Sequence, residues 1–401
     1  MYVWPTIEDA YYRQQSDIYR NMPNPANIAI DGNYDSPGFS AELCAVAAIE
    51  ESTHQVIDFS VVHKSEVENV SNRMELEGVK KLLPAVESNV RIGNITLDKH
   101  PQVVSFLKNH NYDYGFDPWH RLKGIKKELK KLIRSLEDEE KNNMKELARR
   151  FIVHVYKAIE FSNGDVNLCK ELVFAFFLHV QGIHEWPSRK FAELIPVAPN
   201  TDVCKRFQDE KFSLILQCPH VANPNIPDSR HELTRPNSKP YQMLLALVAK
   251  TTFMNDLDKM RHGNNTSFVE SFWSKCIRYR PKMLYFPKIG FLRRTMLAAI
   301  DFNEMRQAEL RGDRRISEIY ECFSKSKGEK VTKVKKSPIS DEWKINIVKE
   351  VIERKRIQGP GDPVHDGHDG QEESDEELDL VCDRLDDLLY FSDSETDDVE
   401  F

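Results

Sequence analysis

The sequence has no long apolar run and few cysteines. No stretch of its 401 residues approaches the ~20 apolar residues that a membrane-spanning helix needs, and the N-terminal MYVWPTIEDAYYRQQ is unlike a secretory signal peptide. The seven cysteines are scattered and odd in number, which argues against a disulfide framework and predicts a reducing compartment. We therefore expect no membrane partner and no disulfide-stabilised fold.

The net charge of −8 hides a basic body and an acidic tail. Residues 361–401 hold 17 of the 64 acids and one of the 56 bases, so residues 1–360 carry 55 bases and 47 acids, a net charge of +8. A basic body predicts a surface that binds a polyanion. The acidic tail is expected to screen that surface or to bind a basic partner.

The periodicity of apolar residues predicts alternating strands and helices. Three strand-like runs, 27–31, 42–50 and 54–63, are joined by turn-rich NYDSPG and ESTH, so we expect an antiparallel meander. Then follow a helix over 67–86, a strand over 91–98, a helix over 101–110, a strand over 112–117 and a basic helix over 119–151. This β-β-β-α-β-α-β-α order is that of the ribonuclease H-like fold, an α/β fold with a five-stranded mixed sheet and flanking helices.

The later part of the chain is mostly helical and then strongly charged. Further helices are expected over 266–281 and 290–310. We divide the chain into a lead-in segment (1–26), the first part of a ribonuclease H-like core (27–140), a large all-helical insertion with a Cys/His cluster (141–262), the final core helices (263–312), a basic linker that can hold a short helix (313–357) and a disordered acidic C-terminal tail (358–401).

Three acids fall where such a fold would gather a metal site. Asp31 ends the first strand and Asp98 ends the fourth, and these two strands are neighbours in a ribonuclease H-like sheet. Glu270 lies on a late helix. Two Mg²⁺ ions about 4 Å apart, held by such carboxylates, can drive phosphoryl transfer without a covalent intermediate. The alternatives are a turn residue for Asp31, a helix N-cap for Asp98 and a capping box from Ser267 to Glu270.

The motif FDPWH, residues 116–120, follows the fifth strand at the same expected edge of the sheet. Asp117 is placed to cap the basic helix. His120 is placed to orient a substrate phosphate or a metal-bound water, and the alternative is a structural histidine packed beside Trp119. Asp35, in a Pro-Gly turn, is most simply a turn residue.

Five short motifs in this order resemble those of eukaryotic cut-and-paste DDE transposases, in particular the Kolobok-like group. The motifs are DGNYDSPGFSA (31–41), MELEG (74–78), TLDKHP (96–101), FDPWH (116–120) and NTSFVESF (265–272). The resemblance covers roughly residues 27–310 and implies a catalytic triad of Asp31, Asp98 and Glu270 with Mg²⁺ or Mn²⁺. It also implies DNA as the partner, a homo-oligomeric active form and a nuclear location.

The sequence departs from this family in several places. No Cys-x₂₋₄-Cys finger precedes the first strand, so we expect the N-terminal THAP zinc domain that often accompanies the group to be missing; Leu97 and Lys99 replace a TDRH-like run, and Trp273 stands where a histidine is expected. We therefore expect a truncated or domesticated copy that cleaves DNA and transfers strands. The alternative is a catalytically inactive, domesticated DNA- or chromatin-binding protein that keeps the fold.

Two further groups of residues point to ligands. His179, His184, Cys218 and His220 are nitrogen and sulfur donors suited to a structural zinc ion, with Cys204 as a substitute; the alternative is ordinary helix and loop residues. A second group could contact DNA phosphates: Arg121, Lys123, Lys126, Lys127, Lys130, Lys131 and Arg134, with Arg278 and Arg280. The alternative for the basic helix is a solvated face. The Lys-rich run 325–336 is read as a nuclear import signal, a DNA arm or a linker.

Overall fold

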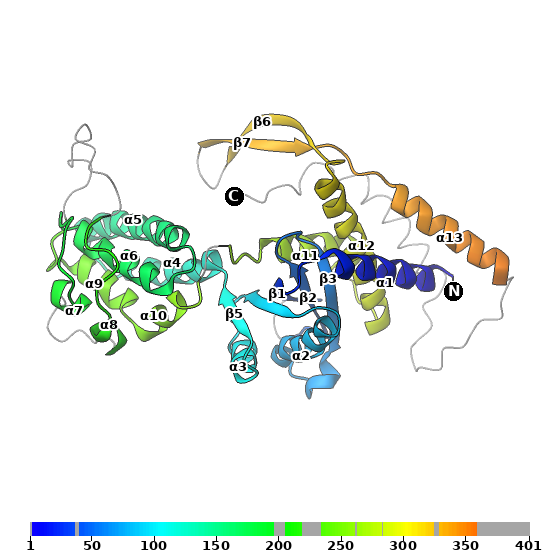
Figure 1. The fold of residues 1–401 in the computed structure, drawn as a ribbon, viewed down its shortest axis with the longest axis horizontal. Helices are drawn as coiled ribbons and strands as arrows, with labels where there is room; N and C mark the ends of the chain where they lie inside the picture. The colour runs from blue at the N-terminus through cyan, green and yellow to red at the C-terminus, as the bar shows by residue number, and fades with distance from the viewer. Residues whose placement is uncertain are drawn as a thin grey trace. The chain divides into compact units, whose positions relative to one another are not determined.

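The computed structural model describes residues 2–36, 40–195, 205–218, 234–260, 263–282, 284–324 and 329–358 (Figure 1). The predicted acidic tail therefore lies outside the described residues, except for Gln358. The chain consists of two compact units. Unit 1 contains residues 1–95, 101–113 and the described residues from Thr266 on, and unit 2 contains residues 96–100 and 114–265.

Five strands between Ala26 and Phe116 form a mixed sheet. Strands β1 (Ala26–Tyr34), β2 (Leu43–Glu50) and β3 (Val56–His63) form the predicted antiparallel meander. With β4 (Ile92–Leu97) and β5 (Asp113–Phe116) they follow the order β3-β2-β1-β4-β5. Strand β2 is buried along its whole length, as expected for the second strand of a sheet covered on both faces.

Helix α2 (Met74–Glu87) covers one face of the meander and approaches it closely. Its residue Gly78 lies against β2 and β3: a Cβ there would come within 2.5 Å of a Val46 side-chain carbon. The hydroxyl of Ser60 donates to the Gly78 carbonyl over 2.8 Å. The glycine of the MELEG motif is therefore required for packing. Two 3₁₀ turns, Lys64–Val67 and Ser71–Arg73, precede the helix, which begins later than residue 67, where the sequence predicted it.

Three helices cover the other face of the sheet: α1 (Val3–Asn21), α11 (Ser267–Tyr279) and α12 (Lys288–Arg311). Their shared core includes Ile7 and Tyr11 from α1, Phe272 from α11 and Phe302 from α12. Residues 1–26, which the sequence analysis treated as a lead-in, thus supply a packed helix of unit 1. Short α3 (Pro101–Asn109) also belongs to unit 1 and contacts α2.

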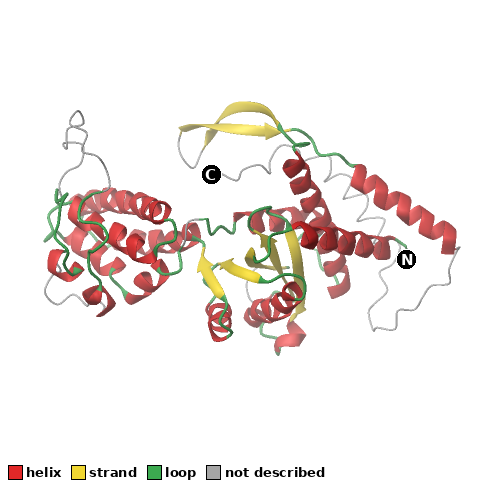
Figure 2. Cartoon of the chain, in the orientation of Figure 1, coloured by secondary structure: helices red, strands yellow, loops and turns green. Residues whose placement is uncertain are grey.

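Unit 2 is almost entirely helical (Figure 2). Its helices are α4 (Pro118–Arg134), α5 (Asp138–Ser162), α6 (Val166–His179), α7 (Phe191–Leu194), α8 (Lys205–Asp209), α9 (Lys239–Val248) and α10 (Thr251–Leu257). Every residue of α6 from Cys169 to Leu178 is buried, so α6 forms the centre of the unit. The predicted single helix over 119–151 is instead two helices, with buried Leu136 in the break between them.

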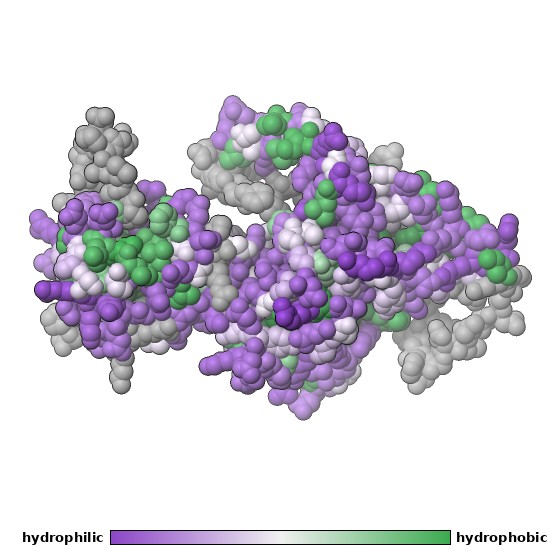
Figure 3. Space-filling view, viewed as in Figure 1, coloured by the Kyte–Doolittle hydropathy of each residue, from purple (hydrophilic) through white to green (hydrophobic). Residues whose placement is uncertain are grey.

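A β-hairpin and a helix follow α12, where the sequence predicted a basic linker that can hold a short helix; the helix was anticipated and the hairpin was not. Strands β6 (Ile316–Ser324) and β7 (Glu329–Lys336) pair in antiparallel register, and α13 (Glu342–Gln358) lies beside α1, where Arg13 pairs with Glu350 at 2.7 Å. Figure 3 shows apolar surface on the hairpin, where Ile319 and Phe323 are 67% and 64% exposed. No helix among the described residues is long and apolar enough to cross a membrane.

Candidate metal and nucleic-acid sites

Asp31 lies within β1, on the face of the sheet that packs against α11. It pairs with Ala47 across the β1–β2 ladder. Side chains alternate between faces along a strand, so Asp31 shares its face with Ala29, which with Ala47 belongs to the core built on α11. Asp35 has a different task. Its carboxylate accepts the backbone N–H groups of Glu42 and Leu43 at 3.1 and 3.2 Å and so closes the β1–β2 loop.

The middle of β1 is a region of negative charge. Glu75, at the start of α2, lies against Gly32, where a Cβ would come within 2.9 Å of its Cγ. Burial, and then the charges of Glu75 and Asp31, raise the pKa of the Cys44 thiol. Gly32 follows Asp31 in the strand, so Glu75 and Asp31 lie on opposite faces of β1. Glu75 belongs to the MELEG motif and was not predicted as a site residue.

Glu270 lies in the first turn of α11 and is exposed. The helix begins at Ser267 with Thr266 as its N-cap residue, and this cap has no side-chain hydrogen bond. A capping box from Ser267 to Glu270, the local alternative for this acid, would need Ser267 as the N-cap residue, a position that Thr266 holds. Buried Val269 and Phe272 hold α11 against the sheet face that carries Asp31, so both acids belong to facing elements of unit 1.

Asp98 and His120 are brought together in unit 2. Asp98 directly follows β4, its side chain is 50% exposed, and one of its carboxylate oxygens is 2.7 Å from Nδ1 of His120. Asp117 caps α4, as the sequence predicts, by accepting the N–H groups of Trp119 and His120. The cap fixes the first turn of α4 and so positions His120. An oxygen of the Asp117 carboxylate lies 3.7 Å from Nδ1 of His120. The ring of Trp119 lies edge-on to His120 at 4.8 Å.

A buried acid that sequence reasoning missed lies beside this pair. Asp256, on α10, is 2% exposed and receives a hydrogen bond of 2.6 Å from the Lys99 ammonium and another from the Arg121 guanidinium. Asp256 therefore ties Lys99, which follows Asp98, and Arg121, which follows His120, to α10. Nothing in the stretch NDLDK distinguishes Asp256 from an ordinary surface acid of a helix, because its partners are about 135 and 157 residues away in sequence.

The predicted triad is therefore divided between the units: Asp31 and Glu270 belong to unit 1, and Asp98 with His120 belongs to unit 2. The convergence of the three carboxylates stays a prediction. Asp31 lies in β1, Asp98 follows β4 and Glu270 lies in α11. Their roles as metal ligands remain predictions.

The basic face of α4 matches the sequence prediction in all but one residue. Leu122, Ile125 and Leu129 are buried. The exposed cations are Lys123, Lys126, Lys127, Lys130, Lys131 and Arg134. Arg121 differs because it is held by Asp256 and is only partly exposed. Lys123 also lies over the ring of Trp119, 4.7 Å from its centroid, which places an exposed aromatic ring beside the cations.

Arg280 is not an exposed DNA contact in this structure. It is 3% exposed, donates to Oδ1 of Asn33 at 3.1 Å and lies over the ring of Phe291, 4.1 Å from the centroid. Burial lowers the pKa of its guanidinium. The sequence CIRYRPK shows the charge of Arg280 but not its burial, which depends on packing against residues distant in sequence such as Asn33. Arg278 is partly exposed.

Three of the four predicted zinc ligands gather in unit 2. Within the described ranges, His179, His184 and Cys218 form the one group of three or more potential metal ligands, with donor atoms within 4.8 Å of one another. Sγ of Cys218 is 3.5 Å from Nδ1 of His179. Burial raises the pKa of the Cys218 thiol to about 11. His220 and Cys204 lie outside the described residues.

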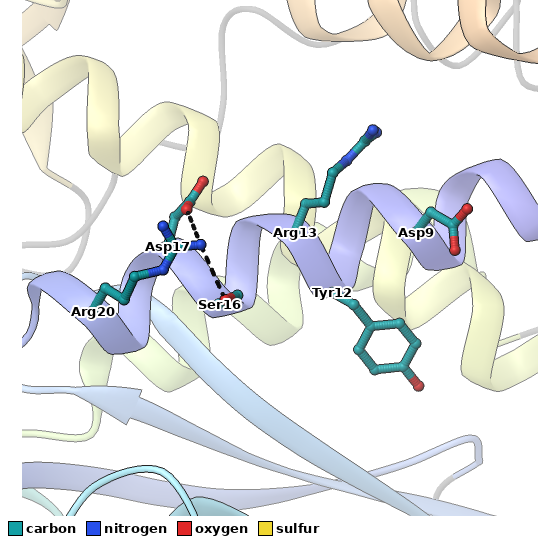
Figure 4. Close-up of a pocket in the computed structure, with 6 residues that line it drawn as sticks. All are labelled: Asp9, Tyr12, Arg13, Ser16, Asp17 and Arg20. Atoms are coloured by element: carbon teal, nitrogen blue, oxygen red, sulfur yellow. Dashed lines mark hydrogen bonds and ion pairs between the residues drawn. The ribbon is translucent and has the colours of Figure 1, made fainter.

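A hollow of ≈ 570 Å³ lies along α1, away from all of these groups. It is lined by Asp9, Tyr12, Arg13, Ser16, Asp17 and Arg20. Figure 4 shows Arg13 and Asp9 on one side of the helix and Tyr12 on the other. Both charged residues are paired with α13, Arg13 with Glu350 and Asp9 with Arg354. All of its lining residues belong to α1, and two of the charged ones are thus already engaged by α13.

The fold and these clusters define an α/β protein with a basic helix and acidic and Cys/His clusters. Comparisons with protein-family models, curated proteins and solved structures found no match to the chain. The function is therefore argued from the residues themselves.

Proposed function

We propose that the chain is a transposase-derived polynucleotidyl transferase that cleaves DNA and transfers strands with divalent metal ions. The observation that carries the proposal is the sheet. An antiparallel meander β1–β3 with the strand order β3-β2-β1-β4-β5 is the arrangement of ribonuclease H-like enzymes, and an acid lies within β1 and another directly after its neighbour β4. Two of the five motifs that resemble DDE transposases, DGNYDSPGFSA and TLDKHP, begin in β1 and β4; MELEG begins α2, FDPWH joins β5 to α4, and NTSFVESF leads into α11.

In this proposal Asp31, Asp98 and Glu270 hold Mg²⁺ or Mn²⁺. When bound, the ions would activate the attacking water or 3′-hydroxyl and stabilise the leaving oxygen. The contact at 2.7 Å between His120 and Asp98 gives His120 a positioning role, because it engages one carboxylate oxygen and leaves the other available. Asp256 supports the arrangement by holding Lys99 and Arg121 on either side of that pair.

The partner in this proposal is DNA. The exposed cations of α4 would contact backbone phosphates, which supply affinity and salt dependence without selecting a sequence. Trp119, 50% exposed at the start of the same helix, offers a ring for an unstacked base. A nuclear location and a homo-oligomeric active form follow from the transposase resemblance and belong to the same proposal.

Nicking of supercoiled plasmid DNA in Mg²⁺ or Mn²⁺ tests the proposal. Wild type is expected to relax the plasmid only with the metal present. Asp31→Asn and Asp98→Asn are each expected to lose more than the ~10–100-fold that residues one step removed from a metal typically cost. Asp35→Asn is the matched control, because Asp35 closes a loop and its replacement still offers an oxygen to the Glu42 N–H. Nicking unchanged in Asp31→Asn and Asp98→Asn would refute the assignment.

A second candidate is a catalytically inactive, domesticated DNA- or chromatin-binding protein. The basic face of α4 favours it, because six exposed cations on one helix can bind phosphates without any metal site. Metal-independent DNA binding by wild type, with no nicking in Mg²⁺ or Mn²⁺, would select this function over the enzyme.

A further inference from the structure

We propose that His179, His184 and Cys218 bind a structural zinc ion that fastens the end of α6 to the loops around residues 184 and 218. The site lies in unit 2 and uses none of the residues assigned to DNA cleavage. It would remain if the proposed enzymatic function proved wrong. Zinc takes four ligands in structural sites, and the described residues supply three of them.

The spacing of the donor atoms fits a tetrahedral ion. Bond lengths of about 2.3 Å to sulfur and about 2.05 Å to nitrogen at a tetrahedral angle put the two donor atoms about 3.6 Å apart. The distance between Sγ of Cys218 and Nδ1 of His179 is 3.5 Å. The rings of His179 and His184 are nearly perpendicular, with centroids 5.1 Å apart. The two imidazoles therefore approach a common point from different directions.

Backbone contacts hold the ligands in place. His179 is the last residue of the buried helix α6. The N–H of Cys218 donates to the carbonyl of His184 over 2.9 Å, and the neighbouring residues Glu185 and Gln217 form an isolated β-bridge. His184 and Cys218 are thus neighbours on two paired backbone segments, and His179 is the last residue of α6.

The buried carboxylate of Glu171 also holds the segment that leads to Cys218. Glu171, on α6 and 3% exposed, accepts the N–H groups of Ser213, Leu214 and Ile215 at 2.7–2.9 Å. The chain therefore fixes the segment that leads to Cys218 through its own hydrogen bonds. A preorganised site of this kind binds metal without paying the full cost of ordering the loop.

The alternative for the three residues is a neutral thiol–imidazole hydrogen bond, for which 3.5 Å is also an acceptable distance. The two cases differ chemically. In the hydrogen-bonded case the Cys218 thiol keeps its proton. Zinc would displace that proton and bind the thiolate. Metal content and proton release therefore separate the two cases.

Metal analysis of the purified full chain tests the site. We expect about one zinc ion per chain in wild type, and replacement by Co²⁺ is expected to give a thiolate-to-cobalt charge-transfer band. Cys218→Ser and His184→Gln are each expected to lower zinc affinity at least tenfold. Cys322→Ser and His110→Gln are the matched controls, because Cys322 lies on β6 and His110 is an exposed histidine after α3.

A second measurement keeps the test valid where a variant fails to fold. A chelator is added to wild type and zinc is then restored, while thermal unfolding is followed by circular dichroism. Zinc is expected to raise the unfolding temperature of wild type and of the Cys322→Ser control. Folded wild type that carries no zinc and takes up no Co²⁺, or Cys218→Ser that retains full zinc affinity, would overturn the proposal. Neither result depends on DNA nicking.

Discussion

Replacement of Glu171 by glutamine should destabilise unit 2 and loosen the loop that leads to Cys218. The Glu171 carboxylate accepts four hydrogen bonds: three from the backbone N–H groups of residues 213–215 and one from the Ser213 hydroxyl, all at 2.7–2.9 Å. A hydrogen bond to a charged group contributes about 1.5–3 kcal/mol, roughly twice that of a neutral pair. The amide oxygen of glutamine can still accept from the three N–H groups, so these three bonds are weakened and not abolished. The Ser213 hydroxyl loses its acceptor, because the amide nitrogen only donates.

We estimate the loss at about 2–3 kcal/mol, or about 1 kcal/mol for each backbone bond. For a unit of this size, 1 kcal/mol shifts the unfolding temperature by about 2–4 °C, so Glu171→Gln should lower it by about 5–10 °C. Hydrogen exchange measured by mass spectrometry should show faster exchange in the peptide that contains residues 213–215. Glu185→Gln, an exposed glutamate near the same loop, is the control. An unfolding temperature and an exchange rate equal to those of the control would refute this reasoning.

Three other variants test separate parts of the account. Gly115→Ala should destabilise unit 2 by about 1–3 kcal/mol, since its Cβ would come within 1.9 Å of Nδ2 of Asn264. Gly124→Ala in α4 should be neutral or stabilising when both variants are compared by thermal unfolding, because its Cβ would lie 3.6 Å from the nearest atom, Nη1 of Arg121. His54 stacks on Phe268, and burial and then Arg306 lower its pKa from 6.5 to about 4. The unfolded chain therefore takes up this proton at a higher pH than the folded chain, so unfolding temperatures should fall as the pH drops from 6.5 to about 4, less so in His54→Gln than in a His110→Gln control. Lys126→Glu with Lys130→Glu should weaken DNA binding and reduce its salt slope by about one for each lysine that contacts a phosphate, while Lys157→Glu with Lys211→Glu, of equal charge, should not.

Much of the sheet could be predicted from sequence because its signals are local. The runs ELCAVAAIE and HQVIDFSVVH combine apolar and β-branched residues between turn residues, and β2 and β3 follow them closely. Asp117 could be recognised as a cap because a proline follows it at the first helical position. The proximity of His179, His184 and Cys218 was predicted from residue types alone, because histidine and cysteine are common zinc ligands, although their spacings are not those of a standard zinc finger.

What could not be predicted depends on contacts between distant residues. Asp256 is a site residue only because Lys99 and Arg121 reach it, and Arg280 is buried against Asn33 and Phe291. The hairpin β6–β7 was missed because its strands are rich in lysine and glutamate and its apolar residues stay exposed, so neither strand has the half-buried alternation of a core strand. Helix α1 was missed because Pro5 and its polar residues hide the apolar residues Ile7, Tyr11 and Ile18 that pack on unit 1.

The central claim is that Asp31, Asp98 and Glu270 share a divalent metal site, and a crystal structure of the full chain soaked in Mn²⁺ tests it most directly. We predict anomalous density for Mn²⁺ coordinated by the carboxylates of Asp31 and Asp98, with Glu270 at the same cluster, and with His120 still bonded to Asp98. Anomalous density elsewhere, or carboxylates of Asp31 and Asp98 too far apart to bind one metal cluster, would contradict it.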